Sequence, residues 1–172
     1  MSKILAVVLL VVIGVFGCDE PKVDVRKAPR GTMIMKLNGV PVPPSPYLTG
    51  SADISGDGIE IQAEFQRDNN GTPYEDSIII FWLDKAALGR VEINGNCPQD
   101  TKPGYVYYRI QTTLVVYESW LVDEPVVGNI TITKLDYEKK LASGTFELKL
   151  KDLNSPDVIE LTEGSFTDLP LF

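Results

Sequence analysis

The sequence predicts a single all-β domain, an antiparallel sandwich or a flattened barrel of about eight to ten strands. Apolar and polar residues alternate with a period of two along most of the chain, as in strands with one buried and one wet face. Turn-forming pairs such as Asn38-Gly39, Asp57-Gly58 and Asn94-Gly95 separate the alternating runs. Helical periodicity is missing, and the best candidate, Tyr137 to Leu141, is one turn at most.

The expected strands follow this alternation in order. They cover residues 31–37, 47–54, 58–66, 76–83, 88–94, 104–117, 128–135, 141–151 and 157–167. Alternation is clearest in 58–66 and 141–151, which carry isoleucine, leucine or phenylalanine at alternate positions. Ile78 to Leu83 is apolar at every position, which predicts a central strand. The proline-rich stretch Pro41 to Pro46 predicts a stiff connector or a sheet edge.

Residues 1–17 have the layout of a secretory signal peptide. Lys3 supplies a positive charge, and residues 4–16 are apolar without interruption. As a helix this stretch would be roughly 20 Å long, too short for a hydrocarbon core of about 30 Å. Gly17-Cys18 then resembles the cleavage and lipidation site of a bacterial lipoprotein more than the end of an ordinary secretory signal.

The predicted lipid on Cys18 organises the rest of the chain. Residues 18–30 are rich in charge and proline and cannot bury a core, so they are expected to form a flexible tether. Residues 31–172 are expected to form the folded domain. A lipoprotein of this type carries two or more acyl chains, which gives stable anchoring. This covalent lipid is the only cofactor that we expect.

Composition argues against several classes of function. The net formal charge is −8, whereas nucleic-acid binding needs basic patches. The chain has no histidine, the commonest general base and transition-metal ligand. Acylation of Cys18 leaves Cys97 as the only thiol, so we expect no disulfide within the chain and an inert Cys97. We therefore expect no enzyme activity. The remaining alternative, a hydrolase, would use paired acids such as Asp123-Glu124 or Glu75-Asp76.

Aromatic residues concentrate between positions 105 and 120 and form a candidate ligand or partner face. Its members are Tyr105, Tyr107, Tyr117 and Trp120. Tyr105 and Tyr107 share one face of their strand, while Tyr108 lies on the opposite face. Such a row could stack on sugars or fill a protein interface. The alternative is that one face is core and the other only shields the sheet.

The stretch from Asp53 to Glu64 resembles a calcium-binding loop. Positions 1, 3, 5 and 12 of such a loop would be Asp53, Ser55, Asp57 and Glu64. The eighth position, usually apolar, is Glu60, and the flanking residues are not helical. A hairpin that turns at Asp57-Gly58 explains the same residues, so no metal site is predicted.

The C-terminal third carries the pattern G-x-I-x-I-T, then SGTF, then T-x-G-x-F, in residues 128–136, 140–146 and 159–166. In this pattern the chain resembles a family of small, uncharacterised Bacteroidota lipoproteins. The stretch Met35 to Pro41 also resembles the opening strand of that family. The resemblance implies an all-β lipidated domain and no activity. The motif itself places Gly144 and Gly164 at bends or bulges, and Phe146 and Phe166 in the core.

Asp19 and Glu20 follow the predicted lipidated cysteine and bear on sorting. In Bacteroidota lipoproteins such acids resemble a signal for export to the cell surface, and in enterobacterial ones an aspartate there resembles inner-membrane retention. The family resemblance favours the outer membrane, with the domain facing the exterior and the periplasmic face as the alternative. We therefore expect a non-catalytic binding or accessory lipoprotein that binds another outer-membrane protein or a glycan. The alternative is a lipocalin-like carrier with a small hydrophobic ligand inside a β-barrel.

Overall fold

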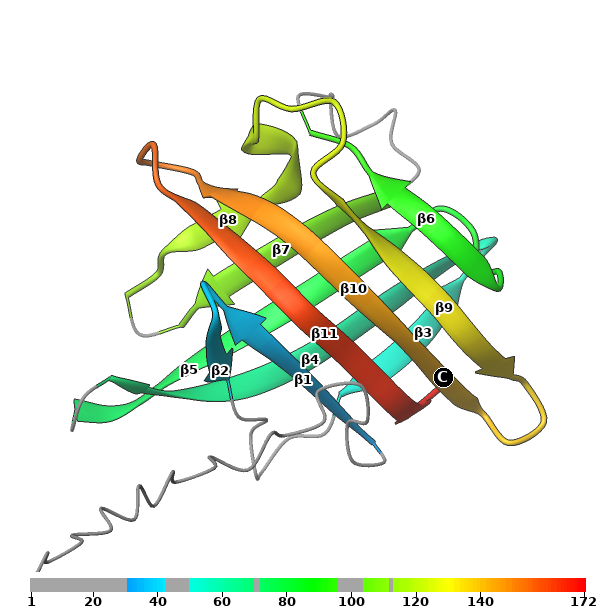
Figure 1. Ribbon diagram of the computed structural model, residues 1–172. Helices are drawn as coiled ribbons and strands as arrows, with labels where there is room; N and C mark the ends of the chain where they lie inside the picture. The colour runs from blue at the N-terminus through cyan, green and yellow to red at the C-terminus, as the bar shows by residue number, and fades with distance from the viewer. Residues whose placement is uncertain (1–30, 43–49, 70–71, 96–103, 112) are drawn as a thin grey trace, which may run out of the picture.

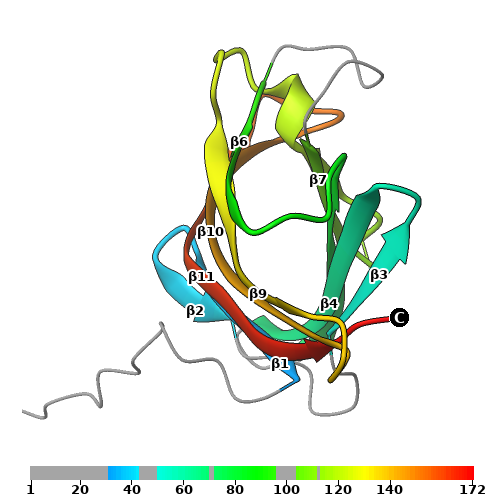
Figure 2. The same cartoon turned by 90° about the vertical axis from the view of Figure 1, so that its right-hand side faces the viewer.

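The computed structural model describes residues 31–42, 50–69, 72–95, 104–111 and 113–172. They form an antiparallel sheet of eleven strands that folds over into two layers, which confirms the predicted all-β class (Figure 1 and Figure 2). Within these ranges no helix is long and apolar enough to cross a bilayer. The predicted signal peptide, Cys18, the tether and Cys97 lie outside the described residues.

The front layer of Figure 1 crosses the back layer at a steep angle. The front layer contains β1 (Thr32–Leu37), β2 (Val40–Val42), β6 (Gly89–Ile93), β9 (Gly128–Asp136), β10 (Leu141–Asp152) and β11 (Val158–Pro170). The back layer contains β3 (Ser51–Ser55), β4 (Gly58–Asn69), β5 (Thr72–Leu83), β7 (Gly104–Ile110) and β8 (Val116–Glu118). The strand order is β2-β1-β11-β10-β8-β7-β5-β4-β3, with β9 beside β10 and β6 beside β9.

Two corners join the layers. Strand β10 pairs with β9 over residues 141–148 and then with β8 at Lys151 and Asp152, so it leads from the front layer into the back layer. At the other corner the chain end meets β3. The Phe172 amide donates to the Ala52 carbonyl at 2.9 Å, and the Ile54 amide donates to the Phe172 carbonyl at 3.2 Å. The sheet therefore curls toward closure around one interior.

Side chains from both layers fill this interior. Alternate positions of β1, β7 and β10 are buried, as their period of two predicts. The largest fully buried side chains include Phe65, Phe81, Tyr108, Phe146 and Phe166. The rings of Phe81 in the back layer and Phe146 in the front layer lie 4.7 Å apart between centroids. The two layers thus share one hydrophobic core.

The glycines of the C-terminal motif make room for its phenylalanines. Gly144 lies opposite Phe166 across the β10–β11 pair, and Phe146 lies opposite Gly164. A side chain on either glycine would overlap with the ring that faces it. The register of β10 against β11 shifts on both sides of these contacts, and both phenylalanines are buried. The expected bulges and the expected core positions are confirmed.

Three expected elements have the following outcomes in the structure: one is divided, one lies at a sheet edge as expected, and one is a turn. The predicted strand 104–117 is two strands, β7 and β8, because the chain turns between them with Leu114 at a φ of 57°. Pro41 lies in β2 at an edge of the sheet, where a missing amide is tolerated, and the following prolines lie outside the described residues. Residues 137–140 form a hairpin turn, and a short 3₁₀ helix, η2, occurs instead at Ser119–Leu121.

Candidate functional site

A groove on the outer face of the back layer is the candidate site. Its volume is about 640 Å³, and its lining residues are Ile78, Ile80, Trp82, Tyr105, Tyr107, Arg109 and Gln111. The first three project from β5, and the next three from β7. Strand pairing sets them in rows, with Trp82 opposite Tyr105, Ile80 opposite Tyr107, and Ile78 opposite Arg109. The floor is therefore two adjacent strands with large side chains at the outward positions from Ile78 to Trp82 and from Tyr105 to Arg109.

The period of two explains how β5 produces this floor. Ile79 and Phe81 point into the core and are fully buried, so Ile78, Ile80 and Trp82 point outward. A strand that is apolar at every position is usually covered on both faces. Strand β5 is central, between β4 and β7, as predicted. Its outer face is nevertheless only partly covered, and Trp82 is 48% exposed.

The aromatic end of the groove is ordered by a hydrogen bond and a ring contact. The Tyr105 hydroxyl donates to Glu118 Oε1 at 3.2 Å. Burial, and next the nearby Glu118 carboxylate, raise the pKa of the Tyr105 phenol above its ordinary value. The indole of Trp82 and the ring of Tyr105 meet edge to face, with centroids 6.0 Å apart. This geometry is favourable for an aromatic pair, and both residues line the groove.

Strand β4 borders the floor with polar and acidic side chains. Glu60 lies opposite Trp82, Gln62 opposite Ile80, and Glu64 opposite Ile78. Among the side chains that the structure describes, neither glutamate has an ion-pair partner. The guanidinium Nε of Arg109 is inaccessible to water, and no described residue accepts a hydrogen bond from it.

The predicted aromatic face is only partly assembled. Tyr105 and Tyr107 lie together in the groove, and Tyr108 is buried in the core, as expected. Tyr117 faces the other way, because it pairs with Tyr108 and its ring lies 6.2 Å from the Tyr108 ring. Trp120 is half-buried in η2 and does not line the groove.

Sequence reasoning missed the β5 half of the groove, together with Arg109. The signal was present in the run Ile78 to Leu83, since apolar residues fill its outward as well as its inward positions. That run predicted a central strand, and nothing in the sequence says whether its second face is covered.

The residues that resemble a calcium-binding loop form a β-hairpin. Strands β3 and β4 join through a turn at Gly56 and Asp57, one residue before the expected Asp57-Gly58 turn, and Asp53 lies opposite Glu60. Glu64 lies further along β4, opposite Ile78, away from this turn. In the part of the chain that the structure describes, no three acidic, cysteine or histidine side chains form a metal-binding group.

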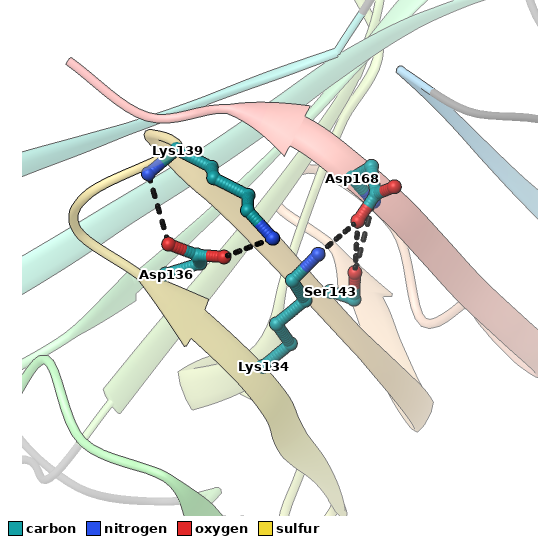
Figure 3. Close-up of polar contacts among 5 residues, drawn as sticks. All are labelled: Lys134, Asp136, Lys139, Ser143 and Asp168. Atoms are coloured by element: carbon teal, nitrogen blue, oxygen red, sulfur yellow. Dashed lines mark hydrogen bonds and ion pairs between the residues drawn. The ribbon is translucent and has the colours of Figure 1, made fainter.

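The polar cluster on the outer face of the front layer holds a bulge in place (Figure 3). Asp168 of β11 has a φ of 50°, which non-glycine residues rarely adopt. Its amide donates to Ser143 Oγ at 2.9 Å, and Lys134 Nζ donates to its carboxylate at 2.8 Å. Asp136 accepts hydrogen bonds nearby from the Lys139 amide and ion-pairs with its ammonium group. These contacts account for the cluster as a structural element.

The acid pairs of the hydrolase alternative do not meet in a described cleft. Glu124 forms an ion pair with Lys149 at 2.9 Å, and this carboxylate raises the pKa of Lys149 by hydrogen bonding. The side chains of Glu75 and Asp76 lie outside the described residues. Comparison with protein-family models, with curated proteins and with solved structures finds no match to this chain.

Proposed function

We propose that this chain is a lipid-anchored, non-catalytic binding subunit of the outer membrane, and that its binding face is the groove on β5 and β7. The ligand is another envelope protein or a glycan. The observation that carries the proposal is the row of outward isoleucine, tryptophan and tyrosine side chains at the centre of the back layer. A mostly apolar groove of this volume with a few polar groups is the usual form of a binding site.

Energetics and composition both support this face. Covering apolar surface is worth about 25 cal/mol per Å², so the groove gains free energy when a ligand excludes water from it. Tryptophan, tyrosine and arginine dominate the residues that contribute most to protein binding, and the groove contains all three types. The tyrosine and tryptophan rings also offer flat faces to a sugar.

The anchored location rests on the sequence around Cys18. Radiolabelled palmitate should enter the expressed full chain and be absent from a Cys18→Ser variant. Protease added to intact cells should then cut the domain if it faces the exterior, whereas a periplasmic domain would be protected. A mature N-terminus mapped away from Cys18 would contradict the anchor.

The interior offers less support for the carrier alternative. A lipocalin-like carrier needs an apolar lumen between its strands. In the described residues, the Phe81–Phe146 contact occupies the space between the layers, and the groove described above lies outside the sheet. We therefore place the ligand on the outer face.

Co-purification from native envelopes in mild detergent tests the binding role. The full chain is compared with an Ile80→Ser/Tyr107→Ser variant, whose changes lie in the groove. The control is Tyr137→Ser, which removes an aromatic ring that is 59% exposed on the β9–β10 hairpin and does not line the groove. A protein or glycan should be retained by the wild type and the control and be lost from the groove variant. Recovery of the wild type alone would contradict the proposal.

A further inference from the structure

The charges around the groove are unbalanced. Glu60 and Glu64 border the floor on the β4 side, and Glu118 of β8 lies beside Tyr107 on the other side. Among the described residues that line the groove, Arg109 is the only cation. Lys151 of β10 lies opposite Glu118 in the same row, so the three carboxylates face two cations and leave a formal excess of one negative charge. This excess comes from Glu60 and Glu64 on the β4 side of the apolar strip. A ligand that carries positive charge beside apolar side chains gains free energy from charge attraction and from apolar contact.

We propose that the groove binds a cationic amphipathic segment of a partner polypeptide. This inference rests on the proposed binding role and names the class of ligand. Apolar side chains of the segment cover Ile78, Ile80 and Tyr107. Its lysine or arginine side chains lie beside Glu60 and Glu64 on the β4 side of the strip.

The centre of the floor favours a polypeptide over a glycan. Ile78 and Ile80 are branched aliphatic side chains, which offer neither a flat ring face nor a hydrogen-bonding group to a sugar hydroxyl. They gain most from contact with other apolar side chains. Tyrosine, tryptophan and arginine around an aliphatic centre match the composition of a protein-interface core.

The dimensions of the strip suit one such segment. Strands β4 and β8 lie three strand spacings apart, about 14 Å, and a helix with its side chains is about 10–12 Å wide. Trp82 and Ile78 are four positions apart along β5, or about 13 Å. An amphipathic helix can therefore lay its apolar stripe on the floor while basic residues beside the stripe reach the carboxylates.

Arg109 makes the two ends of the groove chemically different. It lies at the Ile78 end, while Trp82 and Tyr105 lie at the other end. Its buried Nε lacks an acceptor among the described residues. The two ends of the groove therefore differ in chemistry, with a cation at one end and two aromatic rings at the other.

Peptide binding to the acylated full chain in zwitterionic lipid nanodiscs tests the proposal. The probe is an amphipathic leucine–lysine peptide of about 14 residues, or four helical turns, and its partner probe carries glutamate in place of lysine. A neutral oligosaccharide is the third probe. Protein variants are compared in identical nanodiscs, so that binding of the peptide to lipid cancels.

The lysine peptide should bind and the glutamate peptide should not. A Glu60→Gln/Glu64→Gln variant should bind the lysine peptide roughly three- to tenfold more weakly, as expected for two exposed ion pairs. The matched control, Glu92→Gln/Glu147→Gln, neutralises two exposed acids of the front layer and should bind like the wild type. Raising salt from roughly 50 to roughly 500 mM should reduce the difference between the wild type and the groove variant.

Three results would overturn the inference. They are equal binding of the two peptides, an equal loss in the control variant, and binding of the oligosaccharide alone. If only the oligosaccharide binds, and Tyr107→Ser abolishes that binding, the groove remains a binding site and the proposed function survives. If no probe binds and no partner co-purifies, the proposed function fails as well.

Discussion

Apolar and polar residues alternate along the strands of both layers, but the outer faces of the two layers differ in the kind of side chain that they expose. In the front layer, β10 presents Thr145, Glu147 and Lys149 to water. In the back layer, β5 presents Ile78, Ile80 and Trp82 at its outward positions. The first face is satisfied by solvent, whereas the second gains free energy from being covered.

The charges follow the same division. On the front layer, lysine and acidic side chains pair with one another, as in Lys36–Glu163 at 2.6 Å and Lys134–Asp168 at 2.8 Å. On the back layer, the structure shows no such pair for Glu60 or Glu64 among the described side chains. The front face therefore pairs part of its charge within the chain, whereas the two acids that border the groove show no such pair among the described side chains. Binding should thus depend on the outer face of the back layer, and stability on the core that both layers share.

The sharpest test of this division uses two neighbouring isoleucines of β5. Ile79→Ala should lower the free energy of unfolding by about 2–4 kcal/mol, because it leaves a cavity in the core. Ile80→Ala should cost less than about 1 kcal/mol, because the side chain is only half-buried. Urea denaturation followed by circular dichroism measures both. An equal loss for the two would mean that the groove floor is structural.

The front layer should be sensitive where glycine and phenylalanine interlock. Gly164→Ala should destabilise the protein by about 1–3 kcal/mol, because the new methyl group overlaps with the Phe146 ring. Adding Phe146→Leu should recover part of this loss, since the smaller side chain leaves room. Thr145→Ala, at an exposed position of the same strand, is the control and should be nearly neutral. Simply additive costs would show that the ring does not cause the loss.

The bulge at Asp168 should contribute less. Asp168→Ala removes the acceptor of Lys134 and places alanine at a φ of 50°, so we expect a loss of about 1–2 kcal/mol. Asp168→Asn should cost less, because asparagine tolerates that backbone region and keeps an acceptor oxygen. Chemical denaturation ranks the two variants. The same loss in both would attribute the effect to charge alone, without a backbone contribution.

Sequence patterns predicted the strands better than the face of the site. Alternation in β4 and β10 is a local property and was sufficient to place both strands. The turn between β7 and β8 contains no glycine, so residues 104–117 resembled one strand. In one unbroken strand Tyr117 would share a face with Tyr105 and Tyr107. The turn changes the phase, and Tyr117 faces the core opposite Tyr108.

The groove floor could not be predicted for a different reason. An unbroken apolar run such as Ile78 to Leu83 is consistent with burial on both faces. Whether another element covers the second face depends on the tertiary fold, in which β6 leaves the back layer to pair with β9. The exposure of Ile80 and Trp82 is therefore a property of the topology, and local sequence does not contain it.

The smallest expected effect is the pH dependence that Tyr105 contributes to the back layer. Its phenol pKa is raised above 10, first by burial and then by Glu118, so the folded state favours the protonated form. Below pH 10 the folded and unfolded chains both keep this proton, and the stabilisation is complete. As pH rises through 10 the unfolded chain loses the proton first, so the stabilisation decreases.

Tyr105→Phe removes this dependence together with the hydrogen bond to Glu118. The wild type should be more stable than Tyr105→Phe by about 0.5–1 kcal/mol at neutral pH, and the difference should shrink between about pH 10 and about pH 11. Denaturation midpoints across this range measure it. When both proteins also carry Glu118→Gln, the stability difference should decrease less as pH rises. The carboxylate that contributes to the raised Tyr105 pKa is then gone, whereas burial, the larger cause, remains. A difference that widened with rising pH would reverse the sign and contradict a raised Tyr105 pKa.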